Sequence, residues 1–254
     1  GEAVQSLERT DSGWRVNGGL HASLLVGAGG HFCPVARHLG ASASGAIGVV
    51  RAQEVEFALS PAQQAACQVS ADRPELYFCE DLKGYGWCFR KGDYLNIGLG
   101  REDSHHLSRH VEEFCETLIR RERIPRDVPR RFHGHAYLLY PHAPRPWLAD
   151  GVLLVGDAAG LASAQSGEGI RPAVESGLLA AETILAAAGD YRRARLEPYA
   201  AQMVARFGRR SRGAEARRAA PLVQGIKQWI ARPLFDSRWF ARHVILDRWF
   251  LHAI

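Results

Sequence analysis

The stretch from Val152 to Ile184 constrains the fold of this chain more than any other part of the sequence. It opens with Val152–Val155, a short apolar run typical of a parallel strand covered on both faces. The run ends in Gly156-Asp157-Ala158-Ala159-Gly160, which places a carboxylate at the edge where open α/β sheets bind ligands. A second glycine pair, Gly167 and Gly169, precedes a predicted helix, and exposed N–H groups at a helix N-terminus attract electron-rich atoms. The stretch therefore predicts a strand, a ligand-facing turn and a helix.

These residues resemble the second FAD-binding motif of flavoproteins with the para-hydroxybenzoate hydroxylase fold, in particular the geranylgeranyl reductase family. The family pattern of G-D-A-A-G, G-E-G-I and A-A-E is matched at 156–160, 167–170 and 180–182. The resemblance implies that Asp157 contacts the ribityl and pyrophosphate part of FAD, and that backbone N–H groups of the G-E-G-I turn face the flavin pyrimidine edge. The alternative is an αβ turn whose glycines serve packing alone. The implied cofactor-binding residues are Gly156, Asp157, Gly160, Gly167, Gly169 and Ile170.

A second glycine turn follows a predicted strand over 20–26 and precedes a predicted helix over 32–39. It resembles the family's middle motif, a strand ending in Ala-Asp-Gly, and here it reads Ala28-Gly29-Gly30. Gly29 stands where the family has an Asp that is tied to FAD positioning and pyridine-nucleotide handling. The resemblance implies that Ala28, Gly29 and Gly30 bind FAD, with NAD(P)H as the electron donor. For the nearby Cys33, a buried structural thiol is favoured over a redox role.

The family's first motif, a G-x-G-x-x-G that holds the FAD pyrophosphate, has no counterpart in this sequence. Gly27-Ala28-Gly29-Gly30 lacks the second half of that spacing. We therefore expect an N-terminally truncated chain that lacks the first Rossmann βαβ unit. Whether this chain holds FAD by itself stays open.

Residues 45–144 have the character of an antiparallel sheet, with strands predicted over 74–79, 84–89 and 94–100. Tyr85, Trp87 and Phe89 share one face of the middle strand because strand side chains alternate. They resemble the family's substrate motif P-x-x-Y-x-W-x-F-P, although neither flanking proline is present. An aromatic strip suits an elongated apolar substrate, and an ordinary core strip is the alternative.

The predicted fold class is α/β (α+β). A partial Rossmann-like FAD-binding domain (1–44 and 145–190) carries an inserted antiparallel substrate domain (45–144), and 191–254 form a helical C-terminal region. Within the inserted domain, the periodicity predicts a helix over 104–123, with Ser104 as its N-cap.

The net charge of +5 is unevenly distributed: residues 192–254 hold 14 Lys and Arg against 4 Asp and Glu, a local charge of +10. With Trp229, Trp239 and Trp249 among these cations, peripheral contact with an anionic membrane is one interpretation, and a solvated or packed helical cap is the other. No nucleic-acid motif is present, so no nucleic-acid partner is expected. The five scattered cysteines include no C-x-x-C pair, which indicates a cytoplasmic protein without disulfides or a metal site.

The resemblance implies an enzyme that reduces isoprenoid double bonds by hydride transfer from reduced flavin, with a hydrophobic isoprenoid or lipid substrate. Nothing in the sequence assigns a catalytic residue or a proton donor. An FAD-dependent aromatic monooxygenase of the same superfamily is the nearest alternative. The other is a non-catalytic fragment with a basic membrane-binding tail.

Overall fold

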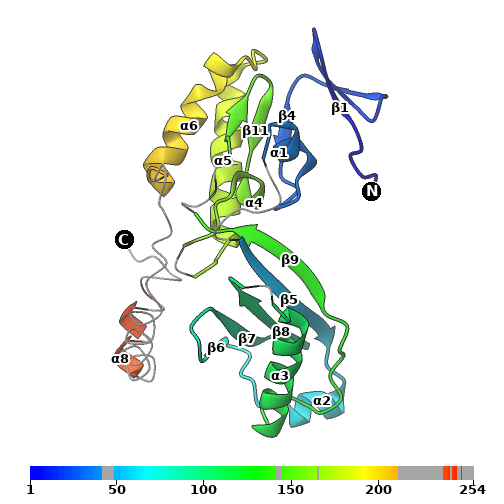
Figure 1. The fold of residues 1–254 in the computed structure, drawn as a ribbon, viewed down its shortest axis with the longest axis vertical. Helices are drawn as coiled ribbons and strands as arrows, with labels where there is room; N and C mark the ends of the chain where they lie inside the picture. The colour runs from blue at the N-terminus through cyan, green and yellow to red at the C-terminus, as the bar shows by residue number, and fades with distance from the viewer. Residues whose placement is uncertain are drawn as a thin grey trace. The chain divides into compact units, whose positions relative to one another are not determined.

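The computed structural model describes residues 1–41, 49–103, 105–140, 143, 145–164, 166–210, 237–240, 242–244 and 247. The chain divides into two compact units, the first made of Gly1–Gly48 with Tyr137–Ile254 and the second of Val49–Ala136 (Figure 1). The second unit is thus an insertion between two halves of the first.

Unit 1 begins with an antiparallel meander of β1 (Leu7–Thr10), β2 (Gly13–Val16) and β3 (Leu20–Ala22), followed by β4 (Leu25–Gly27). The single strand predicted over 20–26 is wrong, because β3 and β4 belong to different sheets. The carbonyl of Gly151 accepts hydrogen bonds from Trp14 Nε1 and from the Leu25 amide, both at 2.9 Å. These two bonds hold the point where the chain leaves one sheet for the other.

The second sheet of unit 1 has the order β10-β11-β4, with β10 at Leu148–Ala149 and β11 at Val152–Leu154. β11 runs parallel to β4, and its three residues are fully buried, as the apolar run predicted. Helices α1 (Pro34–His38), α4 (Gly156–Ala159), α5 (Ile170–Ala187) and α6 (Arg193–Phe207) complete the described core of this unit.

The sequence placed residues 191–254 in a separate region, but its first helix, α6, packs against α5 within unit 1 (Figure 1). The buried Tyr199 of α6 donates from its hydroxyl to the Leu154 carbonyl at 2.7 Å, which ties the helix to β11. The three-residue helix α8 (Arg238–Phe240) lies further along the chain. Trp229 and Trp249, which motivated the membrane interpretation, fall outside the described residues, and the described Trp239 is exposed.

Unit 2 is built on an antiparallel sheet with the order β6-β7-β8-β5-β9. Its strands are β5 (Val49–Ala58), β6 (Glu75–Phe78), β7 (Gly84–Lys91), β8 (Tyr94–Arg101) and β9 (His133–Leu138). The strands predicted over 74–79, 84–89 and 94–100 are all present, which agrees with the predicted meander.

Helix α3 (Leu107–Arg120) lies across one face of this sheet and buries Val111, Phe114, Cys115 and Leu118 on it (Figure 1). The helix begins later than predicted: His106 precedes it in a left-handed conformation, and Ser104, the predicted N-cap, is outside the described residues. A short helix that we did not predict, α2 (Pro61–Ala66), is fixed by a reciprocal capping box between Ser60 and Gln63.

In the part of the chain that the structure describes, no helix has both the length and the apolar character needed to cross a bilayer.

Candidate functional site

The carboxyl ends of β4 and β11 lie next to each other. Leu154 pairs with Gly27, and the Val155 amide donates to the Gly27 carbonyl at 3.0 Å. The two glycine turns that the sequence singled out, 27–30 and 156–160, therefore leave the sheet at the same edge, where parallel α/β sheets bind ligands. The 125 residues of chain between them (31–155) do not keep the two turns apart, because the parallel pairing of β4 with β11 closes that loop.

Asp157 lies in α4, a single helical turn held against α5 by backbone contacts. The Gly156 amide donates to Ser176 Oγ at 3.0 Å, and a methyl group on Gly156 would lie 3.0 Å from the Ala173 side chain. Gly156 and Gly160, at either end of α4, have φ values of +54° and +70°, which favour glycine. The close packing and the left-handed turns together explain why this tip needs glycines.

The downstream glycine pair, Gly167 and Gly169, lies at the start of α5, with Gly169 near Asp157. A methyl group on Gly169 would lie 3.2 Å from Asp157 Oδ1, so the carboxylate and the start of α5 share one wall. Gly167, with φ +68°, lies against the ring of Tyr137. The acidic tip at Asp157 and the glycine at the start of α5 thus lie side by side.

Helix α5 starts with unpaired backbone donors. Gly169 is its N-cap without a side-chain cap, and among the described residues none accepts a hydrogen bond from the amides of Gly169 or Ile170. The next amide, that of Arg171, is satisfied by Glu168 Oε1 at 2.6 Å. Two N–H groups at the positive end of an 18-residue helix are therefore without an acceptor in the part of the chain that the structure describes.

Arg145 is a residue of this site that the sequence analysis missed. Its side chain is buried, with the residue only 4% exposed, and it donates to the carbonyls of His31 (2.7 Å), Asp157 (3.0 Å) and Ala158 (3.2 Å). Burial lowers the pKa of Arg145, and the charge of Asp157 opposes that shift. The available signal was a lone arginine between two prolines just before the buried strand β11.

A second buried guanidinium, that of Arg210, lies beside the first. It stacks 4.5 Å from the Trp147 ring centroid and 5.4 Å from that of Tyr140, and it donates to the carbonyls of Arg145 and Ala159. Burial lowers the pKa of Arg210 to about 10. The edge of the sheet near Asp157 therefore carries two desolvated cations.

The turn at 28–30 is closed by Cys33, which is 1% exposed. A methyl group on Gly29 would lie 3.3 Å from the Cys33 α-carbon, so a side chain there needs a small shift of the turn. The burial of Cys33 agrees with a structural thiol. Ala28 and Gly29 are exposed beside it and Gly30 is half-buried, so this turn presents backbone to a ligand.

The aromatic strip of β7 lies in unit 2 on the face opposite α3. Gly86 and Cys88, which alternate with the aromatic residues, are buried toward the helix, and a methyl group on Gly86 would contact the Phe114 ring. Tyr85, Trp87 and Phe89 are half-buried on the other face, with the first two rings 6.1 Å apart. The core-strip alternative therefore does not describe these three side chains.

Trp87 is fixed in place by its neighbours on β8 and β5. Its Nε1 donates to Asn96 Oδ1 at 2.8 Å, and its ring covers Gly98 so closely that a methyl group on that glycine would collide with it. Asn96 in turn donates to Glu56 at 3.0 Å, and Lys91 pairs with the same carboxylate at 2.8 Å. The strip is a rigid aromatic surface bordered by a polar network.

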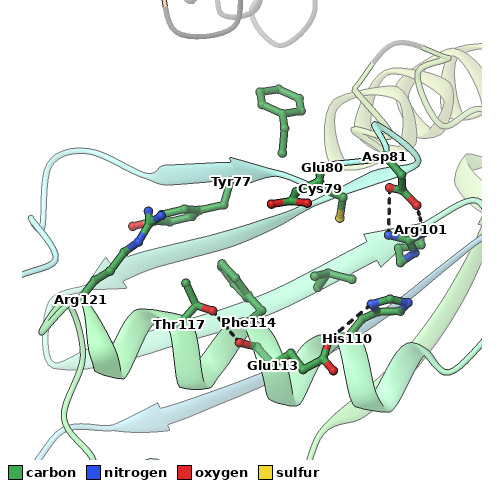
Figure 2. A pocket seen from close by; sticks show the side chains of 12 residues that line it. Tyr77, Cys79, Glu80, Asp81, Arg101, His110, Glu113, Phe114, Thr117 and Arg121 are labelled. Atoms are coloured by element: carbon green, nitrogen blue, oxygen red, sulfur yellow. Dashed lines mark hydrogen bonds and ion pairs between the residues drawn. The ribbon is translucent and has the colours of Figure 1, made fainter. Parts of the chain in front are cut away.

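Unit 2 also has a pocket of about 630 Å³ between β6 and α3 (Figure 2). Arg101, which is 4% exposed, forms the polar end of the pocket. Its guanidinium makes ion pairs with Asp81 (Nη2 to Oδ2, 2.6 Å) and with Asp103 (Nε to Oδ1, 2.6 Å). Since two carboxylates match the donors of this guanidinium, the polar end of the pocket is satisfied by the chain itself. The aromatic strip does not line the pocket, whose walls are Tyr77, Phe78, Cys79, Glu80, Asp81, Leu99, Arg101, His110, Glu113, Phe114, Thr117 and Arg121.

The fold resembles that of solved FAD-dependent oxidoreductases, two of which superpose on most of this chain. A geranylgeranyl bacteriochlorophyll reductase-like protein from Thermoplasma acidophilum superposes with a TM-score of 0.63 at 21% identity, over 91% of this chain and 57% of that one. A probable FAD-dependent monooxygenase from Pseudomonas aeruginosa superposes with a TM-score of 0.52 at 20% identity, over 95% of this chain and 66% of that one. The predicted fold class is confirmed.

The sequence comparison is more specific and relates the chain to the geranylgeranyl reductases, as its motifs predicted. A digeranylgeranylglycerophospholipid reductase of Methanocaldococcus jannaschii is 38% identical over 112 residues, which are 42% of this chain and 28% of that protein. A chloroplastic geranylgeranyl diphosphate reductase of Nicotiana tabacum is 31% identical over 176 residues, 65% of this chain and 34% of that protein. The chain therefore spans about a third or less of these curated relatives. No family model matches the chain.

Proposed function

We propose that this chain is part of an FAD-dependent oxidoreductase that reduces carbon–carbon double bonds of isoprenoid substrates. The observation that carries the proposal is the meeting of Asp157 with the uncapped start of α5 at the edge shared by β4 and β11. The relatives named above, which are called reductases of geranylgeranyl compounds, support the substrate class.

The residues present fit part of an FAD molecule. Asp157 offers a carboxylate that accepts hydrogen bonds from the hydroxyls of the ribityl arm. The amides of Gly169 and Ile170 offer donors to the oxygen and nitrogen atoms of the pyrimidine edge. The turns at 28–30 and 156–160 are made of small residues, so the cofactor can approach the backbone closely.

When bound, FAD would supply the hydride chemistry, and the chain would supply binding and electrostatics. The amides at the start of α5 would stabilise negative charge on the pyrimidine edge of a bound flavin, because they stand at the positive end of the helix dipole. Burial of β11 and of Ala158 and Ala159 beneath this edge keeps water away from one side of the site.

We assign the aromatic strip to the substrate. An isoprenoid chain is long and apolar, and Tyr85, Trp87 and Phe89 offer it a half-buried aromatic surface on the face that α3 leaves uncovered. The hydrogen bond from Trp87 to Asn96 keeps that surface pre-organised.

An aromatic monooxygenase is the second candidate, since the Pseudomonas protein described above shares the fold. The two activities differ in their products. A reductase adds two hydrogens to a double bond of its substrate, and a monooxygenase inserts one oxygen atom from O₂.

The test uses the complete gene product. Purified protein, with FAD added, is expected to show the visible absorption of bound oxidised flavin and to lose it anaerobically with NAD(P)H, the donor we propose. Geranylgeranyl diphosphate or a geranylgeranyl lipid is then expected to reoxidise the flavin and to gain two hydrogens by mass spectrometry. Absence of bound FAD would end the proposal, and oxygen incorporation without double-bond reduction would favour the monooxygenase.

Peripheral membrane contact belongs to the same proposal. Its support is the local charge of +10 over residues 192–254, together with a lipid-like substrate. Co-sedimentation with vesicles that contain anionic lipid, and loss of it in high salt, is the expected result. Equal partition onto neutral and anionic vesicles would contradict an electrostatic contact.

A further inference from the structure

Arg145 joins the two turns that form the candidate cofactor site. Its guanidinium donates to the His31 carbonyl at 2.7 Å on one side, just after the turn at 28–30. On the other side it donates to the carbonyls of Asp157 and Ala158 at 3.0 and 3.2 Å. One side chain therefore spans the gap between the segments that follow β4 and β11.

This bridge depends on the shape of the guanidinium. One terminal nitrogen, Nη1, serves both α4 carbonyls, while the other, Nη2, serves His31 through its carbonyl and also lies 3.3 Å from its Nδ1. A planar fork directs donors to both sides at once, whereas a lysine ammonium offers one centre and cannot reach both turns in the same geometry.

Burying the charged guanidinium of Arg145 costs desolvation free energy. Arg145 is 4% exposed, and its described bonds to the two turns end on backbone carbonyls, with the neighbouring cation Arg210 donating to the Arg145 carbonyl. A buried charge is retained when it makes several hydrogen bonds, and an apolar side chain would fill the space at lower cost. What an apolar side chain would not do is fix the separation of the two turns.

We propose that Arg145 is the positioning residue of the cofactor site: its guanidinium fixes the spacing between the segments at 28–31 and 156–160, and this spacing sets the affinity for FAD. The inference rests on the proposed function for its FAD part. The bridge itself is a property of the protein without cofactor and is tested separately.

The experiment compares Arg145→Lys and Arg145→Gln with the unaltered complete gene product. Arg206→Gln is the matched control, because Arg206 is a surface guanidinium of unit 1 that pairs with Glu175 away from these turns. Amide hydrogen exchange is measured first without FAD, and FAD affinity is then measured by fluorescence titration. The circular dichroism of the flavin bands, recorded at saturating FAD, reports how the flavin is held.

Both Arg145 variants are expected to exchange faster at 28–31 and 156–160 and to show altered flavin bands. They are also expected to bind FAD at least about tenfold more weakly, because displaced turns would lose the equivalent of one charge-assisted hydrogen bond to FAD, such as that proposed for Asp157. Lysine is expected not to restore any of these, while Arg206→Gln matches the unaltered protein. Arg145→Lys with unchanged exchange and unchanged FAD affinity would overturn the proposal, as would full rescue by lysine, which would assign the effect to charge alone.

The two failures are distinguishable. If the unaltered protein binds no FAD, the proposed function fails, and the exchange data still decide whether Arg145 holds the turns together. If Arg145→Gln does not fold, Arg145→Lys, which keeps the charge and most of the volume, carries the same comparison.

Discussion

Gly169 and Asp157 share one wall of the candidate site: a methyl group on the glycine would lie 3.2 Å from Oδ1 of the carboxylate. The distance is shorter than an ordinary contact, so the carboxylate would have to move by a few tenths of an ångström to admit it. This contact connects the tip of β11 with the first turn of α5. It also provides a sensitive way to disturb the site without disturbing the fold.

Gly169→Ala is expected to weaken FAD binding several-fold while leaving the thermal unfolding of the protein nearly unchanged. The φ of Gly169 is −120°, which alanine adopts freely, so the effect comes from crowding of Asp157 and of the adjacent amides. Gly177→Ala on the same helix is the control, because nothing lies within 4 Å of the position of its added methyl group. The control should stabilise the helix by roughly 0.5–1 kcal/mol and bind FAD normally. Equal FAD affinities in the two variants would contradict the shared wall.

Asp157→Asn is expected to reduce FAD affinity by about 1.5–3 kcal/mol, the usual worth of a hydrogen bond to a charged group. This corresponds to a dissociation constant raised roughly 10- to 150-fold in a fluorescence titration. Glu197→Gln removes one exposed carboxylate of the same unit, paired with Arg193, and serves as the control. An unchanged dissociation constant in Asp157→Asn would remove this carboxylate from the site.

Gly98→Ala is expected to destabilise unit 2, because the added methyl group would collide with the Trp87 ring and lie 2.8 Å from the Glu54 side chain. Overpacking of this kind costs about 1–3 kcal/mol in chemical denaturation. Gly134→Ala in β9 is the matched control, since its methyl group would meet ordinary contacts at 3.8 Å. If both variants have the same free energy of unfolding, the close packing of the Trp87 ring on Gly98 would be contradicted.

The ion pairs around Arg101 predict a loss of stability in acid. Hydrogen bonds from Arg101 hold the pKa of Asp103 below its ordinary value; burial would raise that of Asp81, but its bonds to Arg101 leave it lowered too. Carboxyls with lowered folded-state pKa values stabilise the protein above their unfolded pKa, about 3.9, and that contribution is lost as the pH falls through the folded values.

The free energy of unfolding should therefore fall steeply as the pH is lowered below about 4. Asp103→Asn should make this pH dependence shallower and lower the stability at neutral pH, where the pair is intact. Glu112→Gln, which changes an exposed carboxylate on α3, should leave the slope as it is. Denaturation curves between acid and neutral pH measure both, and identical slopes in Asp103→Asn and the unaltered protein would rule out this origin of acid sensitivity.

Strong local patterns made much of this fold predictable. The apolar run at Val152–Val155 predicted a buried strand beside an acidic turn, and alternation along 84–89 placed the aromatic residues on one face of β7. The helix α5 (Ile170–Ala187) is the helix that was predicted to follow the glycine pair Gly167 and Gly169. In each case the residues themselves carry the periodicity of the element.

What could not be predicted depends on partners distant in sequence. The break between β3 and β4 arises because the Gly151 carbonyl accepts hydrogen bonds from both Trp14 and Leu25. The residues near position 23 carry no sequence signal for these distant contacts. From the sequence alone, Arg145 is indistinguishable from an ordinary charged loop residue. Its role becomes visible only in the structure, where its guanidinium donates to three carbonyls from two turns. Ser60 and Gln63 have the spacing of a capping box, which could have predicted α2. The helix is only six residues long, however, so its sequence is hard to distinguish from that of a loop.

The parallel pairing of β4 with β11 has a consequence for how the protein is made. Leu25 cannot meet Val152 until the ribosome has released the whole of unit 2, which lies between them as a continuous segment. Unit 2 can fold as soon as it emerges, but the cofactor-side sheet must wait for the closure of a very long loop. During synthesis, the side of β4 that pairs with β11 thus stays unpaired until the chain has passed Val152.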